Sequence, residues 1–187
     1  MRRILFILFA LVLSAQTVDK GRILMVIAHH GFRDEELKIP KGLFVEAGYR
    51  VEIASTDTTP AEGMLGLKVK PDLLIGEAAE SLYVALVLVG GVGAQSLFSD
   101  TTLHSLIGRF YEAGKPIGAI CLAPVILGRA GILKGRKATV WPGAKEELIR
   151  LGARYLDREV VQDSTIITGA GPQAAELFGR KILQSLK

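Results

Sequence analysis

The sequence predicts an α/β protein built on a mostly parallel sheet, and three observations carry this prediction. Two apolar runs, residues 22–28 and 83–89, lack the alternation of a half-exposed strand, which indicates strands buried on both faces. A helical pattern at residues 34–47 separates the first run from an alternating strand pattern at residues 49–54. Strand, helix and strand in this order form a βαβ unit, whose strands lie parallel with a right-handed crossover.

The remaining elements follow from periodicity and from turn residues. Gly48 ends the first helix, and Pro40 lies near its first turn. Residues 55–80 are less regular, with a short hairpin around residues 66–69. Further along, we expect helices and strands in this order: a helix at 97–113, a strand at 116–120, a helix at 124–130, a strand at 136–140, a helix at 144–151, a strand pair at 159–162 and 165–168, and a closing helix at 172–186.

The only cysteine, Cys121, follows the strand at 116–120 directly and precedes the helix at 124–130. A side chain at such a sharp strand–turn–helix junction is exposed at the top of a sheet. The nearby helix N-terminus favours a thiolate. The alternative is that Cys121 is a small buried apolar residue, as most free cysteines are.

Three predicted strands end at Ala28, Val89 and Ile120, and their carboxyl ends lie along one edge of a parallel sheet. Ligands of open α/β sheets bind at this edge. The loops at residues 29–36, 90–95 and 121–124 are therefore expected to converge.

Composition limits the partners. The chain has 187 residues and 49% hydrophobic content, which suits one domain, expected at residues 16–187. The net charge of +4 is scattered, so nucleic acid is not implied. A single cysteine excludes an intramolecular disulfide, and without a Cys/His cluster no metal site is predicted.

The first 15 residues resemble a secretory signal peptide. Arg2 and Arg3 precede an apolar run at residues 4–13, followed by Ser14 and Ala15. Cleavage after Ala15 would lower the net charge to +2 and leave no stable membrane span, giving a secreted or periplasmic protein. The alternatives are an uncleaved leader that anchors the protein in the membrane, and a misassigned start codon.

Four ordered segments resemble the DJ-1/PfpI superfamily: GFRDEELKIP at residues 31–40, LVLVGGVGAQ at 86–95, KPIGAICLAP at 115–124 and KATVWPGAKEEL at 137–148. The TGAGP segment at 168–172 fits as well. The resemblance implies a flavodoxin-like, doubly wound sheet sandwiched by helices, akin to class I glutamine amidotransferases. It also implies a homodimer or higher oligomer.

The resemblance also implies roles for individual residues. Cys121 matches the elbow cysteine, and Glu36 matches the acid that hydrogen-bonds it. Gly91, beside Gly90, matches the glycine whose N–H joins the N–H of Leu122 in an oxyanion-hole-like pocket. Members of the family are described as cofactor-independent glyoxalases or deglycases of small reactive carbonyls, and others as peptidases, chaperones or oxidation sensors.

The chain departs from this pattern at two histidine positions. Leu122 stands where peptidase-like members carry histidine, and Trp141 replaces a second histidine, so a Cys–His peptidase is not favoured. In the tail, Gly169 and Ala170 replace a Ser-Arg pair.

His29 and His30 are candidates for a substituted base, the alternative being one imidazole bound to backbone and one solvated. Trp141 is expected to line the pocket or a subunit contact. The hypotheses are therefore an exported enzyme acting on small carbonyls, a redox-responsive or chaperone-like protein using the same thiol, and a structural dimer with a relic pocket.

Overall fold

A computed structural model describes residues 20–187 of the chain. The proposed leader at residues 1–15 lies outside the described residues. Within the described part, no helix is long and apolar enough to cross a membrane.

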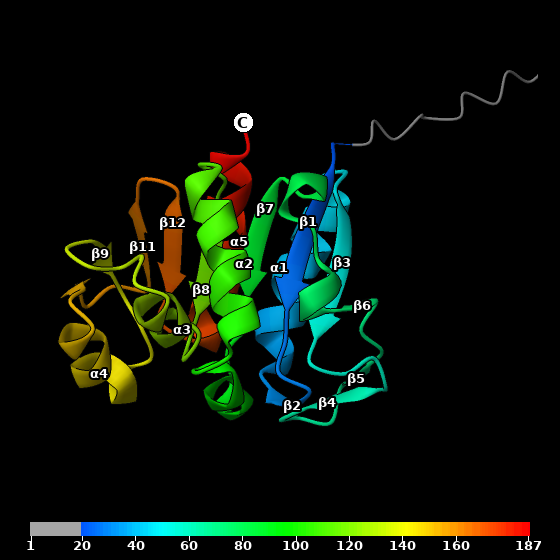
Figure 1. Cartoon of the computed structure of the whole chain (residues 1–187), viewed down its shortest axis with the longest axis horizontal. Helices are drawn as coiled ribbons and strands as arrows, with labels where there is room; N and C mark the ends of the chain where they lie inside the picture. The colour runs from blue at the N-terminus through cyan, green and yellow to red at the C-terminus, as the bar shows by residue number, and fades with distance from the viewer. Residues whose placement is uncertain (1–19) are drawn as a thin grey trace, which may run out of the picture.

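A seven-stranded sheet forms the centre of the molecule (Figure 1). Every neighbouring pair in it is parallel except β11 and β12, which form an antiparallel hairpin at one edge. In spatial order the strands are β11 (Val160–Asp163), β12 (Ile166–Gly169), β8 (Ile117–Ile120), β7 (Ala85–Leu88), β1 (Arg22–Val26), β3 (Arg50–Ser55) and β6 (Leu73–Leu74). The expected mostly parallel α/β sheet and the expected edge hairpin are both confirmed.

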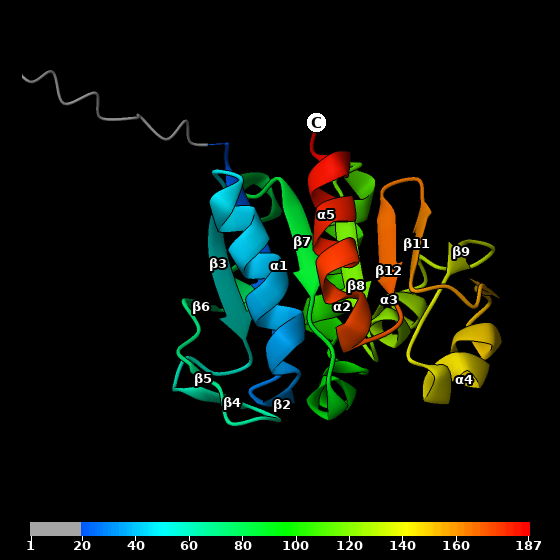
Figure 2. The ribbon, with the colours of Figure 1, turned by 180° about the vertical axis from the view of Figure 1, so that it is seen from behind.

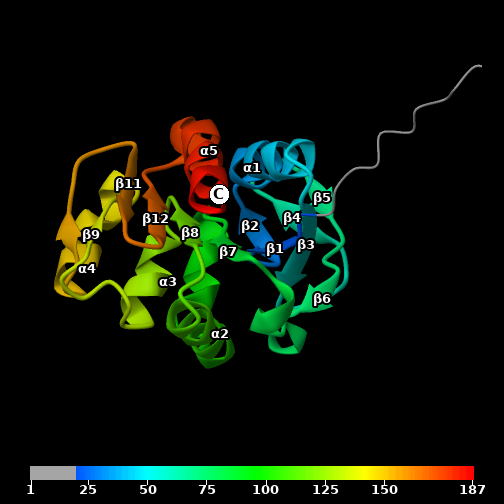
Figure 3. The same cartoon turned by 90° about the horizontal axis from the view of Figure 1, so that it is seen from above.

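Helices cover both faces of this sheet (Figures 2 and 3). On one face lie α1 (Asp34–Glu46) and α5 (Ala175–Ser185), and on the other lie α2 (Thr101–Glu112) and α3 (Pro124–Arg129). Helix α4 (Lys145–Arg150), which has six residues like α3, lies beyond the β11–β12 edge.

The two faces of the sheet explain the unbroken apolar runs. In β1, Ile23 and Met25 pack into the core beneath α1 and α5, whereas Leu24 and Val26 pack into the core beneath α2. All four are completely buried. Alternate residues of one strand thus belong to two cores, so neither face tolerates a polar residue.

Two small sheets flank the central one. The first joins β2 (His30–Phe32), β4 (Ala61–Gly63) and β5 (Lys68–Val69), which confirms the expected hairpin and adds an unpredicted strand. Asp34 fixes its turn, because the carboxylate accepts hydrogen bonds from the N–H groups of Leu65 (3.0 Å) and Leu67 (2.8 Å). The second pairs β9 (Lys137–Ala138) with β10 (Arg154–Tyr155).

The helix expected at residues 97–113 begins later than the sequence indicated. Asp100 caps α2 by accepting a hydrogen bond from the N–H of Leu103 (2.9 Å), and the preceding residues form the 3₁₀ helix η3 (Val92–Leu97). The closing helix likewise opens with the 3₁₀ helix η5 (Pro172–Ala174). Three other short 3₁₀ helices lie in connections: η1 (Ile75–Glu77), η2 (Glu80–Leu82) and η4 (Pro142–Ala144).

Candidate active site

The three loops expected at the carboxyl edge of the sheet do converge. The Arg33 N–H donates to the Gly90 carbonyl oxygen (3.0 Å), which joins the first loop to the second. Gly90 lies so close to Cys121 that a Cβ atom placed on Gly90 would be 2.5 Å from the Cβ of Cys121. The second loop therefore packs against the third. The site is therefore built from segments that are far apart in the chain.

Cys121 occupies a sharp turn between β8 and α3. Its φ of 62° lies in the left-handed region, which few residues other than glycine adopt. The turn is held from both sides, because the Cys121 N–H donates to the Gly169 carbonyl (2.9 Å) and the Trp141 N–H donates to the Cys121 carbonyl (2.9 Å). Backbone strain held this way is typical of functional sites, and the expected elbow geometry is confirmed.

Glu36 reaches the thiol from the first turn of α1 and is completely buried. Its Oε2 accepts a hydrogen bond from the Gly90 N–H (3.0 Å), and its Oε1 is buried with no hydrogen-bond partner in the described chain. Burial raises the pKa of Glu36 to about 7, although hydrogen bonds with Cys121 and Gly90 act in the opposite direction. Near neutral pH this carboxyl group can therefore both take up and release a proton.

The thiol of Cys121 loses its proton less readily than the sequence suggested. Burial, together with the negative charge of Glu36, raises the pKa of Cys121 to about 12, although the N–H groups of Gly91 and Leu122 act in the opposite direction. The expectation that the helix N-terminus would favour a thiolate is wrong, because burial outweighs the backbone N–H groups that lower the pKa of the thiol. When Glu36 is protonated its charge no longer opposes ionisation, so one proton can move between carboxyl and sulfur.

Two glycines make this close packing possible. A Cβ on Gly90 would lie 2.5 Å from the Cβ of Cys121 and 2.7 Å from Oε2 of Glu36. Gly91 has a φ of 96°, and a Cβ there would lie 2.5 Å from the Arg33 nitrogen. The Gly-Gly pair thus lets a carboxyl group, a thiol and an N–H donor occupy one small volume.

A pocket of about 170 Å³ opens over Cys121. Its walls are mostly apolar. Trp141, which is 43% exposed, lines the pocket as expected. The lining residues are Arg33, Met64, Gly91, Val92, Cys121, Leu122, Trp141 and Pro172. Four of these were not predicted as site residues: Arg33, Met64, Val92 and Pro172. For Arg33 the available signal was its position just before the helix at the ligand edge of the sheet.

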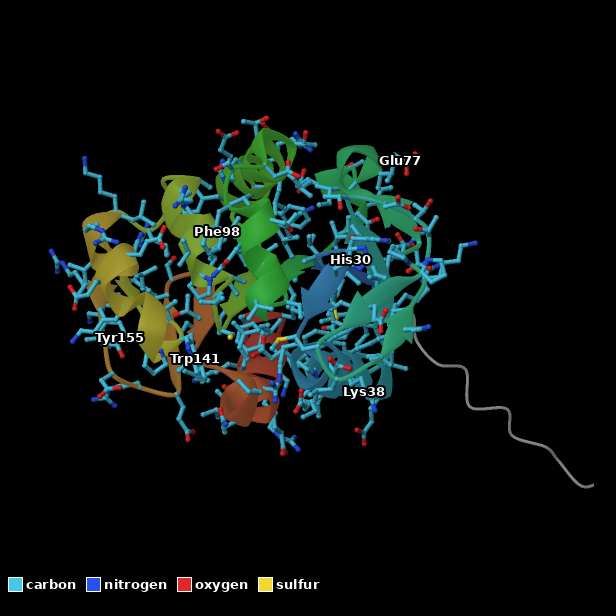
Figure 4. All side chains as sticks on the ribbon, turned by 90° about the horizontal axis from the view of Figure 1, so that it is seen from below. His30, Lys38, Glu77, Phe98, Trp141 and Tyr155 are labelled. Atoms are coloured by element: carbon cyan, nitrogen blue, oxygen red, sulfur yellow. The ribbon has the colours of Figure 1, made fainter. Side chains whose placement is uncertain are left out.

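His29 and His30 do not line the pocket of Cys121. They line a neighbouring hollow with Asp57 and Gln95, where Nε2 of His29 lies 3.3 Å from Oγ1 of Thr59. Figure 4 shows His30 on the side of the small β2–β4–β5 sheet and Trp141 towards α4. This placement gives no support to the hypothesis of a substituted histidine base.

Within residues 20–187, no three His, Cys, Asp or Glu side chains are grouped as metal ligands. The thiol of Cys121, the carboxyl group of Glu36, the backbone N–H groups of Gly91 and Leu122, and Arg33 are polar groups at the pocket.

Known proteins are similar to this chain over most of its length. The chain is 34% identical over 156 residues to Deglycase PH1704 of Pyrococcus horikoshii, covering 83% of this chain and 94% of the relative. It is 44% identical over 175 residues to the uncharacterised protein MJ0967 of Methanocaldococcus jannaschii, covering 92% and 85%.

The structure superposes on the ThiJ/PfpI domain protein from Brachyspira murdochii with a TM-score of 0.87 at 29% identity, covering 90% of this chain and 96% of the other. The sequence profile of the DJ-1/PfpI family matches residues 21–185. The chain belongs to the DJ-1/PfpI family.

Proposed function

We propose that the protein converts small reactive carbonyl compounds in a reaction of the glyoxalase or deglycase type. The reaction uses Cys121 and Glu36 and needs no cofactor. The observation that carries the proposal is a buried carboxyl group with a pKa of about 7 beside the thiol. The similarity to a protein named a deglycase supports the same reaction class.

The first step is addition of the thiol to an aldehyde. As the sulfur of Cys121 forms a bond to the carbonyl carbon, ionised Glu36 takes up the thiol proton, and the carbonyl electron pair moves to oxygen. The N–H groups of Gly91 and Leu122, which act to lower the pKa of the thiol, are the donors expected to stabilise the developing oxyanion. Proton transfer from Glu36 to that oxygen completes a hemithioacetal.

For a 2-oxoaldehyde the same two groups finish the reaction. Glu36 removes the hydrogen of the hemithioacetal carbon as a proton, and the neighbouring keto carbon receives a proton in return. The hydroxyl proton of the former aldehyde carbon passes to the keto oxygen, so that this carbon becomes a thioester carbonyl and the keto group becomes an alcohol. Water then hydrolyses the thioester to a 2-hydroxy acid and restores the thiol, so the net change is addition of one water.

Turnover of methylglyoxal tests this proposal. Wild-type protein should form lactate, whereas Cys121→Ser and Glu36→Gln should lose at least about 100-fold in rate, as expected for removal of a nucleophile or a general base. Ser105→Ala, on the exposed side of α2, is a matched control that should keep the wild-type rate. Equal rates in wild type and Cys121→Ser, or none in either, would contradict the proposal.

A second candidate is oxidation sensing by the same thiol. The unpartnered Oε1 of Glu36 favours it, because a protonated carboxyl group can hydrogen-bond a sulfinic acid at Cys121. Two equivalents of hydrogen peroxide would add two oxygens to the sulfur and leave two waters. Mass spectrometry after mild peroxide treatment tests this, and oxidation of exposed Met64 with none at Cys121 would count against it.

We also propose export through residues 1–15 and self-association. N-terminal sequencing of the protein recovered outside the cytoplasm should begin at Gln16, and a full-length N-terminus would argue against cleavage. Native mass spectrometry should show a dimer or larger assembly, and a monomer at micromolar concentration would argue against self-association.

A further inference from the structure

Arg33 is the charged side chain in the lining of the Cys121 pocket. The other lining residues are apolar side chains, glycine, proline and the thiol itself. The buried carboxyl group of Glu36 approaches the thiol without belonging to this lining. Arg33 is therefore the source of positive charge beside a pocket whose other lining residues are neutral.

The main chain of Arg33 is fixed beside the reacting groups. Its N–H donates to the carbonyl oxygen of Gly90 (3.0 Å), and its nitrogen lies 2.5 Å from the Cβ position of Gly91. Gly91 supplies one of the two donors proposed to stabilise the oxyanion. Arg33 thus belongs to the same rigid junction as the oxyanion donors.

Glu35 orients the guanidinium group without using all of its donors. Nε donates to Oε2 of Glu35 (2.8 Å) and Nη2 donates to Oε1 (3.1 Å), so this carboxylate occupies one edge of the group. Within residues 20–187, Nη1 makes no hydrogen bond. A guanidinium group has five N–H donors in a planar fork, so a second carboxylate can bind at the remaining edge.

We propose that Arg33 selects substrates that carry a carboxylate a few bonds from the reacting carbonyl, such as a 2-oxoaldehyde with an acidic tail. The inference rests on the proposed function and adds the substrate class. Each water-sized group occupies about 30 Å³. The pocket of about 170 Å³ therefore has room for the reacting end of such a substrate. A singly charged carboxylate suits the site better than a phosphate, because Asp34, Glu35 and Glu36 lie in the same helical turn.

Turnover gives the first test. The probes are 4,5-dioxopentanoate, which carries a carboxylate, and 2-oxopentanal, an uncharged counterpart of similar length. Arg33→Gln should lower the ratio of kcat/KM for the charged over the uncharged substrate by about tenfold, the usual worth of one charge-assisted hydrogen bond. An unchanged ratio would overturn the proposal.

Alkylation gives a second test that does not need turnover. Cys121 is the only cysteine, so its reaction with iodoacetate and with iodoacetamide reports on this pocket alone. Arg33→Gln should lower the iodoacetate-to-iodoacetamide rate ratio about tenfold, and added salt should lower it in wild type but not in the variant. Arg180→Gln removes a similar arginine–glutamate pair elsewhere on the surface and should keep the wild-type ratio.

The two tests separate the possible failures. If no carbonyl is converted but the alkylation ratio falls in Arg33→Gln, the proposed reaction is wrong and Arg33 still selects anions. If carbonyls are converted and neither ratio depends on Arg33, the reaction stands and the role given to Arg33 is wrong.

Discussion

Replacing Glu36 with glutamine should make the protein more resistant to unfolding at alkaline pH while it removes activity. The unfolded carboxyl group has a pKa of 4.5, whereas burial raises the folded value to about 7. Between these values the folded state binds more protons than the unfolded state. Stability therefore falls as pH rises through this window, because ionisation of the buried group opposes folding.

The magnitude follows from the same interval. Each pKa unit corresponds to about 1.36 kcal/mol, so the ionised carboxyl group costs about 3 kcal/mol at pH 8 relative to pH 4. Glutamine has no charge to bury, and its side-chain oxygen can still accept the hydrogen bond from the Gly90 N–H. Its buried amide adds a cost of its own, but that cost is the same at both pH values.

Urea unfolding of both proteins at pH 4 and pH 8 measures this effect. The free energy of unfolding of Glu36→Gln minus that of wild type should be about 3 kcal/mol larger at pH 8 than at pH 4. Glu46→Gln, on the exposed end of the same helix, should show a difference below about 0.5 kcal/mol at either pH. Parallel pH profiles for wild type and Glu36→Gln would refute the assignment of a raised pKa.

Three further substitutions test the packing around the site. Gly90→Ala should destabilise the fold by about 1–3 kcal/mol and slow alkylation of Cys121, because its Cβ would overlap the thiol and Glu36; wild-type stability and reactivity together would contradict the crowding. Asp34→Asn should cost about 1–3 kcal/mol in urea unfolding, since the amide cannot accept both N–H groups of the β4–β5 turn equally well, and a neutral effect would show the turn needs no such tie. Asp100→Ala should cost about 1 kcal/mol through the lost cap of α2, with no change in Cys121 reactivity, and altered reactivity would indicate a coupling absent from the structure.

The central sheet and the position of the nucleophile could be predicted from sequence for a physical reason. A strand buried on both faces needs an unbroken apolar run, and β1, β7 and β8 all have one. The carboxyl ends of such strands share an edge by topology alone. Cys121 and Glu36 followed from this edge together with the motifs around them.

The peripheral strands could be predicted only in part: a strand was expected at residues 136–140, where the shorter β9 forms, and a hairpin around residues 66–69, but β2 and β10 have no pattern of their own. Strands β9 and β10 contain two residues each and exist only by pairing with one another. The turn between β4 and β5 depends on Asp34, which lies about 30 positions earlier in the chain. A strand of two or three residues is too short to show a periodicity. Hydrogen bonds between residues about 30 positions apart leave no signal in the local sequence.

The protonation state of the thiol could not be predicted from the local sequence either. The helix after Cys121 suggested an acidic thiol, but the dominant influences are burial and the charge of Glu36, which lies far away in the chain. Arg33 was missed for a related reason, since its role depends on which edge of its guanidinium group Glu35 occupies.

The first turn of α1 places three consecutive acids in three different surroundings. Asp34 holds the β4–β5 turn, Glu35 holds Arg33, and Glu36 faces the thiol. Successive helical residues point about 100° apart, so inserting or deleting one residue here would rotate every side chain into its neighbour's place. Such a change would give the thiol the wrong acid while leaving the composition nearly unaltered. A change in length at this turn would therefore disturb all three contacts at once, whereas a single substitution disturbs one of them.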